Sequence, residues 1–514
     1  MTTSSNRASP AEPTGNSVIN GGGLGHAAAR GATFSLASQL MRFAMQFCGI
    51  VVLGRLLSPS DYGLIAMVVA LVGVGEILRD VGLGAAAVQS ETSTQLQRSV
   101  LFWISVSTGV LLSVAVYLCA PLIAELYDNE LVADLVRAIA VTFALNGIAA
   151  QSRAHLIRKL QFGRIAIVEV FAQSVALTFA IWFAIGGHGY WSLAWQQIIQ
   201  ALITMVGFVL LAKWVPSLPK RRSGVGNQLK FGSAYMATQL LVYISSNVSS
   251  VILGARFGAA QLGLYNRAFQ LFSLPLNQIT APATNVALAT LSRIQNDEKR
   301  FDSFVLRGQL ILTNTVIFFY VLAFVEADAF VSIALGEGWT EIVPLLRAFI
   351  VGGLFQSISF SAFWIFSARG LAGSNFRFAL ITRILLIALV SVGAYLSVQA
   401  AASFYAIGLI CIWPLGLLWL NKLHGVHVSF LFYAGIRTIS VYVSWGCVAY
   451  FVTRDVQDSI ISISASFFVL SVGSVVTACL WATYRQDIQQ ILQTVQLLRG
   501  PSAIGNTKES VSHD

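Results

Sequence analysis

The sequence predicts an all-α multi-pass membrane protein with about 14 transmembrane helices, arranged as two pseudo-symmetric six-helix lobes followed by two C-terminal helices. Three observations lead to this prediction. Of the 514 residues, 56% are hydrophobic and only 11% are charged, whereas soluble domains carry about 25% charged residues. The apolar residues form long, closely spaced segments. One stretch of the chain also recurs 200 residues later.

Fourteen apolar segments follow a polar N-terminal stretch, and about 20 apolar residues suffice to cross a bilayer core. The first 29 residues are rich in Ser, Thr, Asn, Pro and Gly and lack the basic-then-apolar start of a signal peptide, so they are expected to form a flexible tail. The predicted spans are residues 31–56, 62–84, 100–120, 132–151, 165–186, 190–212, 229–254, 262–290, 304–326, 345–368, 374–397, 401–421, 434–453 and 459–483.

Basic residues gather in alternate loops, and this pattern predicts the orientation. The loops around Arg158, Lys220 and Lys299 are rich in Lys and Arg, whereas the opposite set of loops includes the acidic stretch 125–130. By the positive-inside rule, the basic loops and both termini are cytoplasmic. The formal net charge of +10 is therefore attributed to membrane topology, and no nucleic-acid partner is expected.

A parallel internal repeat predicts the two lobes. Residues 31–64 align without gaps on residues 231–264, with eight identities in 34 positions. The identical pairs include Gln39/Gln239, Gly54/Gly254 and Gly63/Gly263. Shared membrane composition would match Leu and Ala by chance, but matched Gln and Gly positions at one offset favour duplication. In such repeats the substrate site lies between the lobes.

The repeat and the loops together predict the domain organisation. Its parts are a cytoplasmic tail (1–29), an N-lobe of helices 1–6 (30–214), a basic cytoplasmic linker (215–230), a C-lobe of helices 7–12 (231–423), helices 13 and 14 (424–484) and a cytoplasmic C-terminal tail (485–514).

Arg42 lies near the middle of the first predicted span, about 11 residues or ~17 Å from its start. An arginine at this depth costs roughly 2.5–3.5 kcal/mol on the insertion scale, so a specific environment must compensate its charge. Two interpretations stay open. Arg42 lines a wet cavity that accepts an anionic substrate, or it forms a structural ion pair with an acidic neighbour such as Glu76.

Further polar residues are candidates for a site inside the membrane. Glu76, Arg79 and Asp80 share one face of the second span, either for ion coupling through a carboxylate with a shifted pKa or as an internal ion pair. Arg267 stands near the start of the eighth span, upstream of two prolines that allow a kink. The other candidates are Arg383, Gln39, Gln239 and Asn247 for the cavity wall and Glu169 for ion coupling.

Motifs of catalysis are absent from the sequence. We find no P-loop, no zinc-type spacing and no Ser/His/Asp set. The five cysteines contain no CxxC pair and are interpreted as small buried apolar residues. No catalytic residue, metal or cofactor is therefore predicted, and the chain is not expected to be an enzyme.

Several segments occur in an order typical of one transporter family. They are LGRLLSPSDYGLIAM (53–67), RDVGLGAAAVQ (79–89), LIRKLQFGRIA (156–166), GYWSLAWQQ (189–197), ARFGAAQLGLYNRAFQLFSLPLNQI (255–279) and ALATLSRIQNDEKRF (287–301). Across residues 30–375, the chain resembles the WzxC-like bacterial polysaccharide repeat-unit flippases of the MOP exporter superfamily. In one departure, Ser249 stands where that family commonly has Asp, so the ion-coupling role of that carboxylate does not transfer.

The resemblance implies a flippase that works by alternating access. Its substrate would be an oligosaccharide on undecaprenyl pyrophosphate, moved to the periplasmic leaflet of the bacterial inner membrane for exopolysaccharide or lipopolysaccharide assembly. Arg42 and Arg267 would contact the pyrophosphate or acidic sugars. Membrane lipids, the polysaccharide polymerase and the export machinery are the implied partners. Two alternatives are a drug or metabolite antiporter, which would have an acidic cavity, and a membrane enzyme of glycan assembly, which would need a periplasmic catalytic loop.

Overall fold

The computed structural model describes residues 39, 41–80, 95–159, 161–217, 226–423 and 428–499, which are predominantly helical and contain no strand. The helices are 41–56, α2 (Pro59–Asp80), α4 (Gln95–Leu126), α5 (Glu130–Arg158), α6 (Phe162–Ile185), α7 (Trp191–Ala212), α8 (Gly226–Leu291), α9 (Glu298–Val325), α10 (Ala327–Ala334), η1 (Glu337–Trp339), α11 (Ile342–Ala368), α12 (Ala372–Leu396), α13 (Val398–Asn421), α14 (Ser429–Thr453), α15 (Ser459–Leu480) and α16 (Ala482–Arg499).

Eleven helices in the described part of the chain are long and apolar enough to cross a membrane. Helix α8 consists of two helical arms joined at Gly258, where the backbone adopts φ 78° and ψ −178°. Glycine reaches this conformation at no steric cost because it has no Cβ. With the helix 41–56 and the two arms of α8, the eleven spans account for the fourteen predicted from the sequence. The prediction of an all-α multi-pass membrane protein is confirmed.

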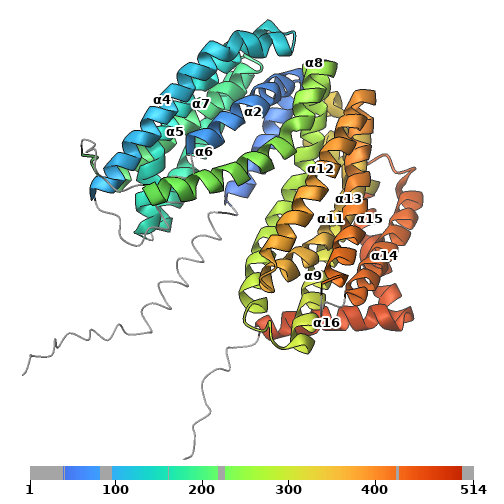
Figure 1. Ribbon diagram of the computed structural model, residues 1–514. Helices are drawn as coiled ribbons and strands as arrows, with labels where there is room; N and C mark the ends of the chain where they lie inside the picture. The colour runs from blue at the N-terminus through green and yellow to red at the C-terminus, as the bar shows by residue number, and fades with distance from the viewer. Residues whose placement is uncertain are drawn as a thin grey trace, which may run out of the picture.

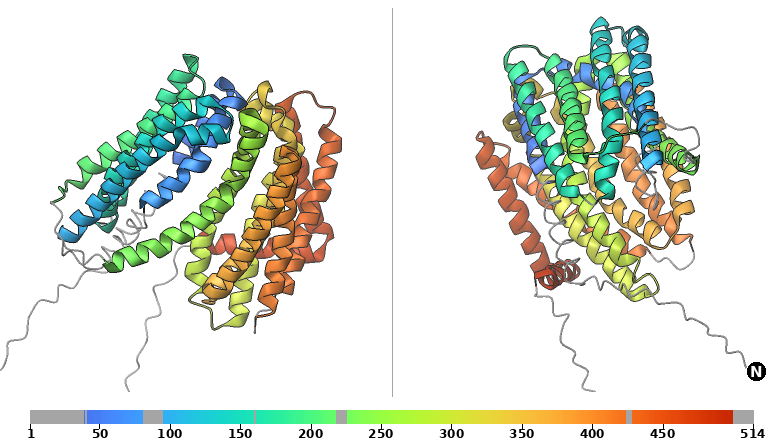
Figure 2. Two further views of the ribbon diagram at one scale, coloured as in Figure 1. Left: turned by 45° about the horizontal axis from the view of Figure 1, so that its top comes forward. Right: turned by 90° about the vertical axis from the view of Figure 1, so that its left-hand side faces the viewer.

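The helices form two lobes that converge at one end and diverge toward the other (Figures 1 and 2). The N-lobe contains the helix 41–56 and α2 to α7, and the C-lobe contains α8 to α13, with α14 and α15 packed outside it. The largest contact between the lobes joins α2 to α8. It lies at the end where α2 begins and α8 bends.

Two repeat-related glycines form the centre of the contact between the lobes. A Cβ atom on Gly63 would lie 1.7 Å from the carbonyl oxygen of Ala259, and one on Gly263 would lie 1.8 Å from that of Pro59. No side chain fits at either position, so the backbones of α2 and α8 touch directly. Because Gly63 and Gly263 are equivalent in the repeat, the two lobes meet through the same segment of each copy.

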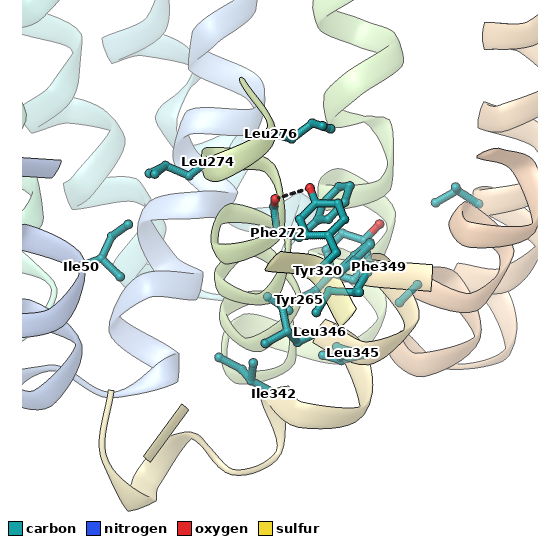
Figure 3. Packing of buried hydrophobic residues seen from close by; sticks show 14 of the residues in the cluster. Ile50, Tyr265, Phe272, Leu274, Leu276, Tyr320, Ile342, Leu345, Leu346 and Phe349 are labelled. Atoms are coloured by element: carbon teal, nitrogen blue, oxygen red, sulfur yellow. Dashed lines mark hydrogen bonds between the residues drawn. The ribbon is translucent and has the colours of Figure 1, made fainter. Parts of the chain in front are cut away.

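Aromatic packing holds the second arm of α8 within the C-lobe (Figure 3). The Phe349 ring lies 5.1 Å from that of Tyr265 and 5.8 Å from that of Phe272. The Tyr320 hydroxyl donates to the carbonyl oxygen of Phe272 over 2.9 Å. Offset and edge-on aromatic pairs each contribute roughly 0.5–1.5 kcal/mol beyond their buried area. This packing fixes the arm that carries Arg267.

The structure departs from the sequence analysis in three places. The five cysteines are exposed on the spans and were wrongly interpreted as buried, because a bilayer accepts a small apolar residue on the outer surface as readily as a core does. Helix α8 begins at Gly226, inside the expected linker. Helix α16 occupies part of the expected C-terminal tail and crosses the ends of the C-lobe helices (Figure 1). It is anchored there by a 2.6 Å ion pair between Arg437 and Asp487.

Candidate functional site

A large polar cavity lies inside the N-lobe and has a volume of about 750 Å³. Helices 41–56, α2, α5, α6 and α7 form its wall. Its polar lining residues are Arg42, Glu76, Thr142, Asn146, Arg153, Glu169, Gln173, Gln197, Gln200 and Thr204. These side chains come from helices that are otherwise strongly apolar. Charged and amide groups placed this way inside a membrane protein mark a water-filled pathway.

Arg42 lines this cavity and is also ion-paired. Its guanidinium donates to Oε2 of Glu169, while Oε1 of Glu169 accepts from Nη2 of Arg153 over 3.1 Å. One carboxylate therefore bridges two arginines, and this group carries a net charge of +1. The Arg42 side chain retains 36% of its exposure, so part of its five-donor guanidinium still faces the cavity. Arg42 thus lines a cavity and also forms an ion pair, with Glu169 as the acidic partner.

Glu76 belongs to a separate polar group in the same cavity. Its Oε2 accepts from Nε of Arg79 over 2.9 Å, and its Oε1 accepts from the Asn146 amide over 3.1 Å. Arg79 lies in the last turn of α2 and is not among the residues that line the cavity. The side chain of Asp80 lies outside the described residues. Glu76 and Arg79 therefore form the internal ion pair that the sequence left as one of two alternatives.

Amide side chains make up much of the wall, and the sequence analysis did not identify them. Gln197 and Gln200 lie one turn apart on α7, and Gln173 projects from α6. The signal was present in the segment WQQIIQ, where amides recur at spacings of three and four in an apolar helix. Polar residues at that spacing share one helix face, so they predict a common wet surface.

A second cavity, of about 270 Å³, continues from the first toward the contact between the lobes. Gln173, Gln197 and Gln200 line both cavities, which makes the two spaces neighbours with a shared wall. The second cavity also includes Arg267 and Gln270 from α8. A polar space therefore runs from the middle of the N-lobe to the C-lobe.

Arg267 is the best-buried cation of the site, with 5% of its surface exposed. Its Cζ atom lies 3.6 Å from the centroid of the Tyr62 ring, and Nη1 donates to the side-chain oxygen of Gln270. Its Nε has no hydrogen-bond partner among the described residues. No carboxylate of the described residues forms an ion pair with Arg267. The guanidinium therefore holds an uncompensated positive charge beside the second cavity.

The contact between the lobes lies next to this cation. The Tyr62 ring packs edge-on against Trp339, with 5.5 Å between ring centroids. Nε1 of Trp339, in turn, donates to the carbonyl oxygen of Gly54 over 2.7 Å. Trp339 belongs to the C-lobe and Gly54 to the N-lobe, so this hydrogen bond joins the two lobes at the closed end of the cavity. Arg267 is thereby placed between the cavity and the closed end.

The remaining predicted residues lie apart from this space. Arg383 lines a separate cavity of about 100 Å³ within the C-lobe. The Gln39 amide donates to Gln278 across the lobes at 3.5 Å. Gln239 is exposed, and the Asn247 amide donates back to its own helix, to the carbonyl oxygen of Tyr243 at 2.9 Å. The described structure therefore brings Arg42, Glu76, Glu169 and Arg267 to one polar space.

Comparisons with known sequences agree with this arrangement. Residues 52–344 match the family model described as polysaccharide biosynthesis protein. The lipopolysaccharide biosynthesis protein WzxC of Escherichia coli K12 is 25% identical over 375 residues, which cover 71% of this chain and 75% of that protein. The teichuronic acid biosynthesis protein TuaB of Bacillus subtilis is 26% identical over 448 residues, covering 83% and 89%.

Solved structures share the fold. The lipid II flippase MurJ in an inward closed conformation superposes with a TM-score of 0.68 at 16% identity, over 87% of this chain and 99% of that one. An inward-facing multidrug resistance MATE family transporter of the MOP superfamily gives a TM-score of 0.57 at 14% identity, over 76% and 96%. At these identities the likeness concerns the fold, which is that of a two-lobed membrane transporter.

Proposed function

The chain belongs to the polysaccharide biosynthesis protein family, and from this premise we propose that it moves a lipid-linked oligosaccharide repeat unit across the bacterial inner membrane. The carrier is undecaprenyl pyrophosphate, and the product serves exopolysaccharide or lipopolysaccharide assembly. The coarser conclusion, that the chain is a multi-pass membrane transporter, follows from its relatives and its fold. The proposal of an oligosaccharide substrate is based on the residues of the site.

One observation supports this substrate above all others. The polar space that runs from the N-lobe to Arg267 combines an amide-rich wall with one buried cation that has no carboxylate partner among the described residues. Amide groups offer both donors and acceptors, which suits the hydroxyl groups of sugars. The larger cavity, at about 750 Å³, falls within the usual range of roughly 300–1,000 Å³ for ligand sites. It has room for an oligosaccharide head group, while the lipid tail stays in the bilayer.

The charged residues differ between the larger cavity and the second cavity. In the larger cavity Glu169 forms ion pairs with both Arg42 and Arg153. Each of these two arginines therefore has a carboxylate partner. Arg267 has no such match among the described residues, so we assign the pyrophosphate or acidic sugar to it. Arg42 adds the spare donors of its guanidinium. The acidic cavity of a drug antiporter, the first alternative, is not what these residues form.

The different arrangement of the lobes at the two ends of the molecule supports a mechanism of alternating access. The lobes are joined at one end by the backbone contact of Gly63 with Ala259 and by the hydrogen bond from Trp339 to Gly54. They diverge at the other end, where the basic loops lie. By the positive-inside rule that end is cytoplasmic. The structure then corresponds to a state open to the cytoplasm, and release requires the closed end to separate.

The leaflet that holds the lipid-linked intermediate tests the proposal. In a strain lacking this gene, the intermediate should accumulate on the cytoplasmic side, out of reach of a membrane-impermeant oxidant of sugars. Wild-type protein should restore both accessibility and polymer export. Arg267→Gln and Arg42→Ala should not, although both are expected to reach normal levels in the membrane. Normal periplasmic exposure of the intermediate in the deletion strain would refute the assigned function.

A further inference from the structure

Another, much smaller pocket lies at the end of the N-lobe where the basic loops are found. Arg98 in the first turn of α4, His155 and Arg158 at the end of α5, and Trp214 just beyond α7 line it together with Gln151. The pocket is separate from the two cavities of the candidate site and shares no lining residue with them. The proposed transport function does not use it.

Two buried donors in this pocket have no acceptor among the described residues. Nε of Arg98 and Nε1 of Trp214 are both shielded from solvent, and neither has a hydrogen-bond partner in that part of the chain. Arg98 donates from Nη1 to Nδ1 of His155, over 3.2 Å. An unpaired buried donor costs about 1–3 kcal/mol, and more when it is charged. Such a cost is recovered when an external acceptor enters the pocket.

The electrostatics specify the kind of acceptor. Arg98 and Arg158 both line the pocket, and Lys159 follows directly on α5. No Asp or Glu lines it within the described part of the chain, and Arg98 forms no ion pair there. Two guanidinium groups around buried N–H donors suit a phosphate oxygen.

The position of the Trp214 donor is fixed by packing. The indole stacks on His155, with 6.1 Å between ring centroids, and meets Phe102 edge-on at 5.9 Å. The segment that follows Trp214 is held to α4, because the backbone N–H of Ser217 donates to the Ser99 hydroxyl over 3.0 Å. The indole N–H is therefore held in place before any ligand arrives.

We propose that this pocket binds the phosphate of an anionic phospholipid in the leaflet that faces the basic loops. The cavity measures about 10 Å³, which is about one water-sized sphere. One phosphate oxygen enters it, and the rest of the head group stays at the mouth. Basic pockets between transmembrane helices on the cytoplasmic side are a known type of site for such head groups.

The surface next to the pocket accommodates the acyl chains. Beyond Arg98, helix α4 exposes Trp103, Val110 and Val114, at 37%, 47% and 53%. These residues follow each other at helical spacing, so they form one apolar face that starts a little over one turn from Arg98. An indole near the membrane interface is a common anchor at the level of head groups. The lipid-facing surface thus lies on the same helix as Arg98, one to a few turns further along it.

Thermal unfolding of the delipidated full-length chain in detergent tests the site, with phosphatidylglycerol, phosphatidylcholine or inorganic phosphate added. Phosphatidylglycerol should raise the midpoint in a saturable way, and phosphatidylcholine should not. Arg98→Gln should weaken the apparent affinity about tenfold to a hundredfold, as expected for one charge-assisted hydrogen bond. Trp214→Phe keeps the ring stacking but removes the N–H, and should weaken it about tenfold.

Arg164→Gln is the matched control. Arg164 lies at the start of α6, is exposed, and bonds only to Gln161 within the described residues, so its loss removes the same charge without touching the pocket. It should bind phosphatidylglycerol as the wild type does. An equal effect of Arg164→Gln, or an equal shift with phosphatidylcholine, would overturn the proposal. A shift produced by inorganic phosphate alone, with no further gain from the lipid, would assign the pocket to free phosphate and overturn the lipid.

Discussion

The contact between the lobes makes a quantitative prediction for Gly63→Ala. The new Cβ atom would lie 1.7 Å from the carbonyl oxygen of Ala259, whereas real Cβ contacts stay above 3.0 Å. The helices must therefore move apart by at least about 1.3 Å at this end. Forced overpacking of this kind costs typically about 1–3 kcal/mol. The cost applies only while the lobes are closed here, so the variant should favour the state that is open at this end by about fivefold to more than a hundredfold.

Spin labels measure this shift directly. Glu130 of the N-lobe and Glu337 of the C-lobe are exposed residues of the two loops at the closed end, and replacing both by labelled cysteines reports the separation of the lobes. The five native cysteines are exposed and must be replaced first. Gly63→Ala should move the distance distribution to longer values and lower polymer export, because closing this end becomes difficult.

Gly373→Ala is the control for this experiment. Gly373 also lies in a helix, α12, but a Cβ atom there meets nothing within 4 Å. Both substitutions gain the same helix propensity of roughly 0.5–1 kcal/mol, so the difference between them isolates the steric effect. A Gly63→Ala protein with the wild-type distance distribution and wild-type export would refute the reasoning.

Three further predictions concern Arg267, Trp339 and Tyr127. Arg267→Gln should abolish export at normal protein levels, and Arg267→Lys should restore only part of it, because lysine lacks the planar fork that stacks on the tyrosine ring; export assays with membrane blots check both. Trp339→Phe removes the 2.7 Å hydrogen bond to Gly54 and should lower the free energy of unfolding by about 1 kcal/mol, measured by thermal unfolding. Burial, and secondarily the neighbouring Tyr243, raises the pKa of Tyr127 to about 12 from its ordinary 10.0. The folded state therefore retains this proton longer than the unfolded state, and stability should be full below pH 10 and decline toward pH 12. Tyr127→Phe should lack that decline.

The global architecture could be predicted because its causes are local in the sequence. Span length, loop charge and the repeated glycines each act within one segment, and the fourteen spans and two lobes followed from them. The helix ends could not be placed as well. Helix α16 is slightly polar on average, and the 2.6 Å pairing of Asp487 with Arg437 that holds it depends on two residues 50 positions apart.

The site was predicted in part, for a different reason. Which face of a helix turns inward is decided by packing, so a polar residue in a span shows that some polar space exists without showing where. Gln239 therefore proved exposed, and the Asn247 amide returned to its own helix. The partner of Arg42 was misidentified because Glu76 is close in sequence, whereas Glu169 is 127 residues away and reaches Arg42 from α6. Tertiary proximity of this kind leaves no trace in a single sequence.

The meeting of Gly63 with Gly263 has a consequence for the origin of asymmetry in the molecule. A surface that contacts its own duplicate is isologous, as in a two-fold symmetric dimer, so any change in the ancestral segment altered both sides of the seam at once. The positions that carry the cargo chemistry follow no such pairing. Arg267 corresponds to Met67 in the first copy, and Arg42 corresponds to Val242 in the second. The two halves thus keep the same contact surface, whereas the residues inside each half differ. The two lobes therefore line the path across the membrane with different side chains, although they share one fold.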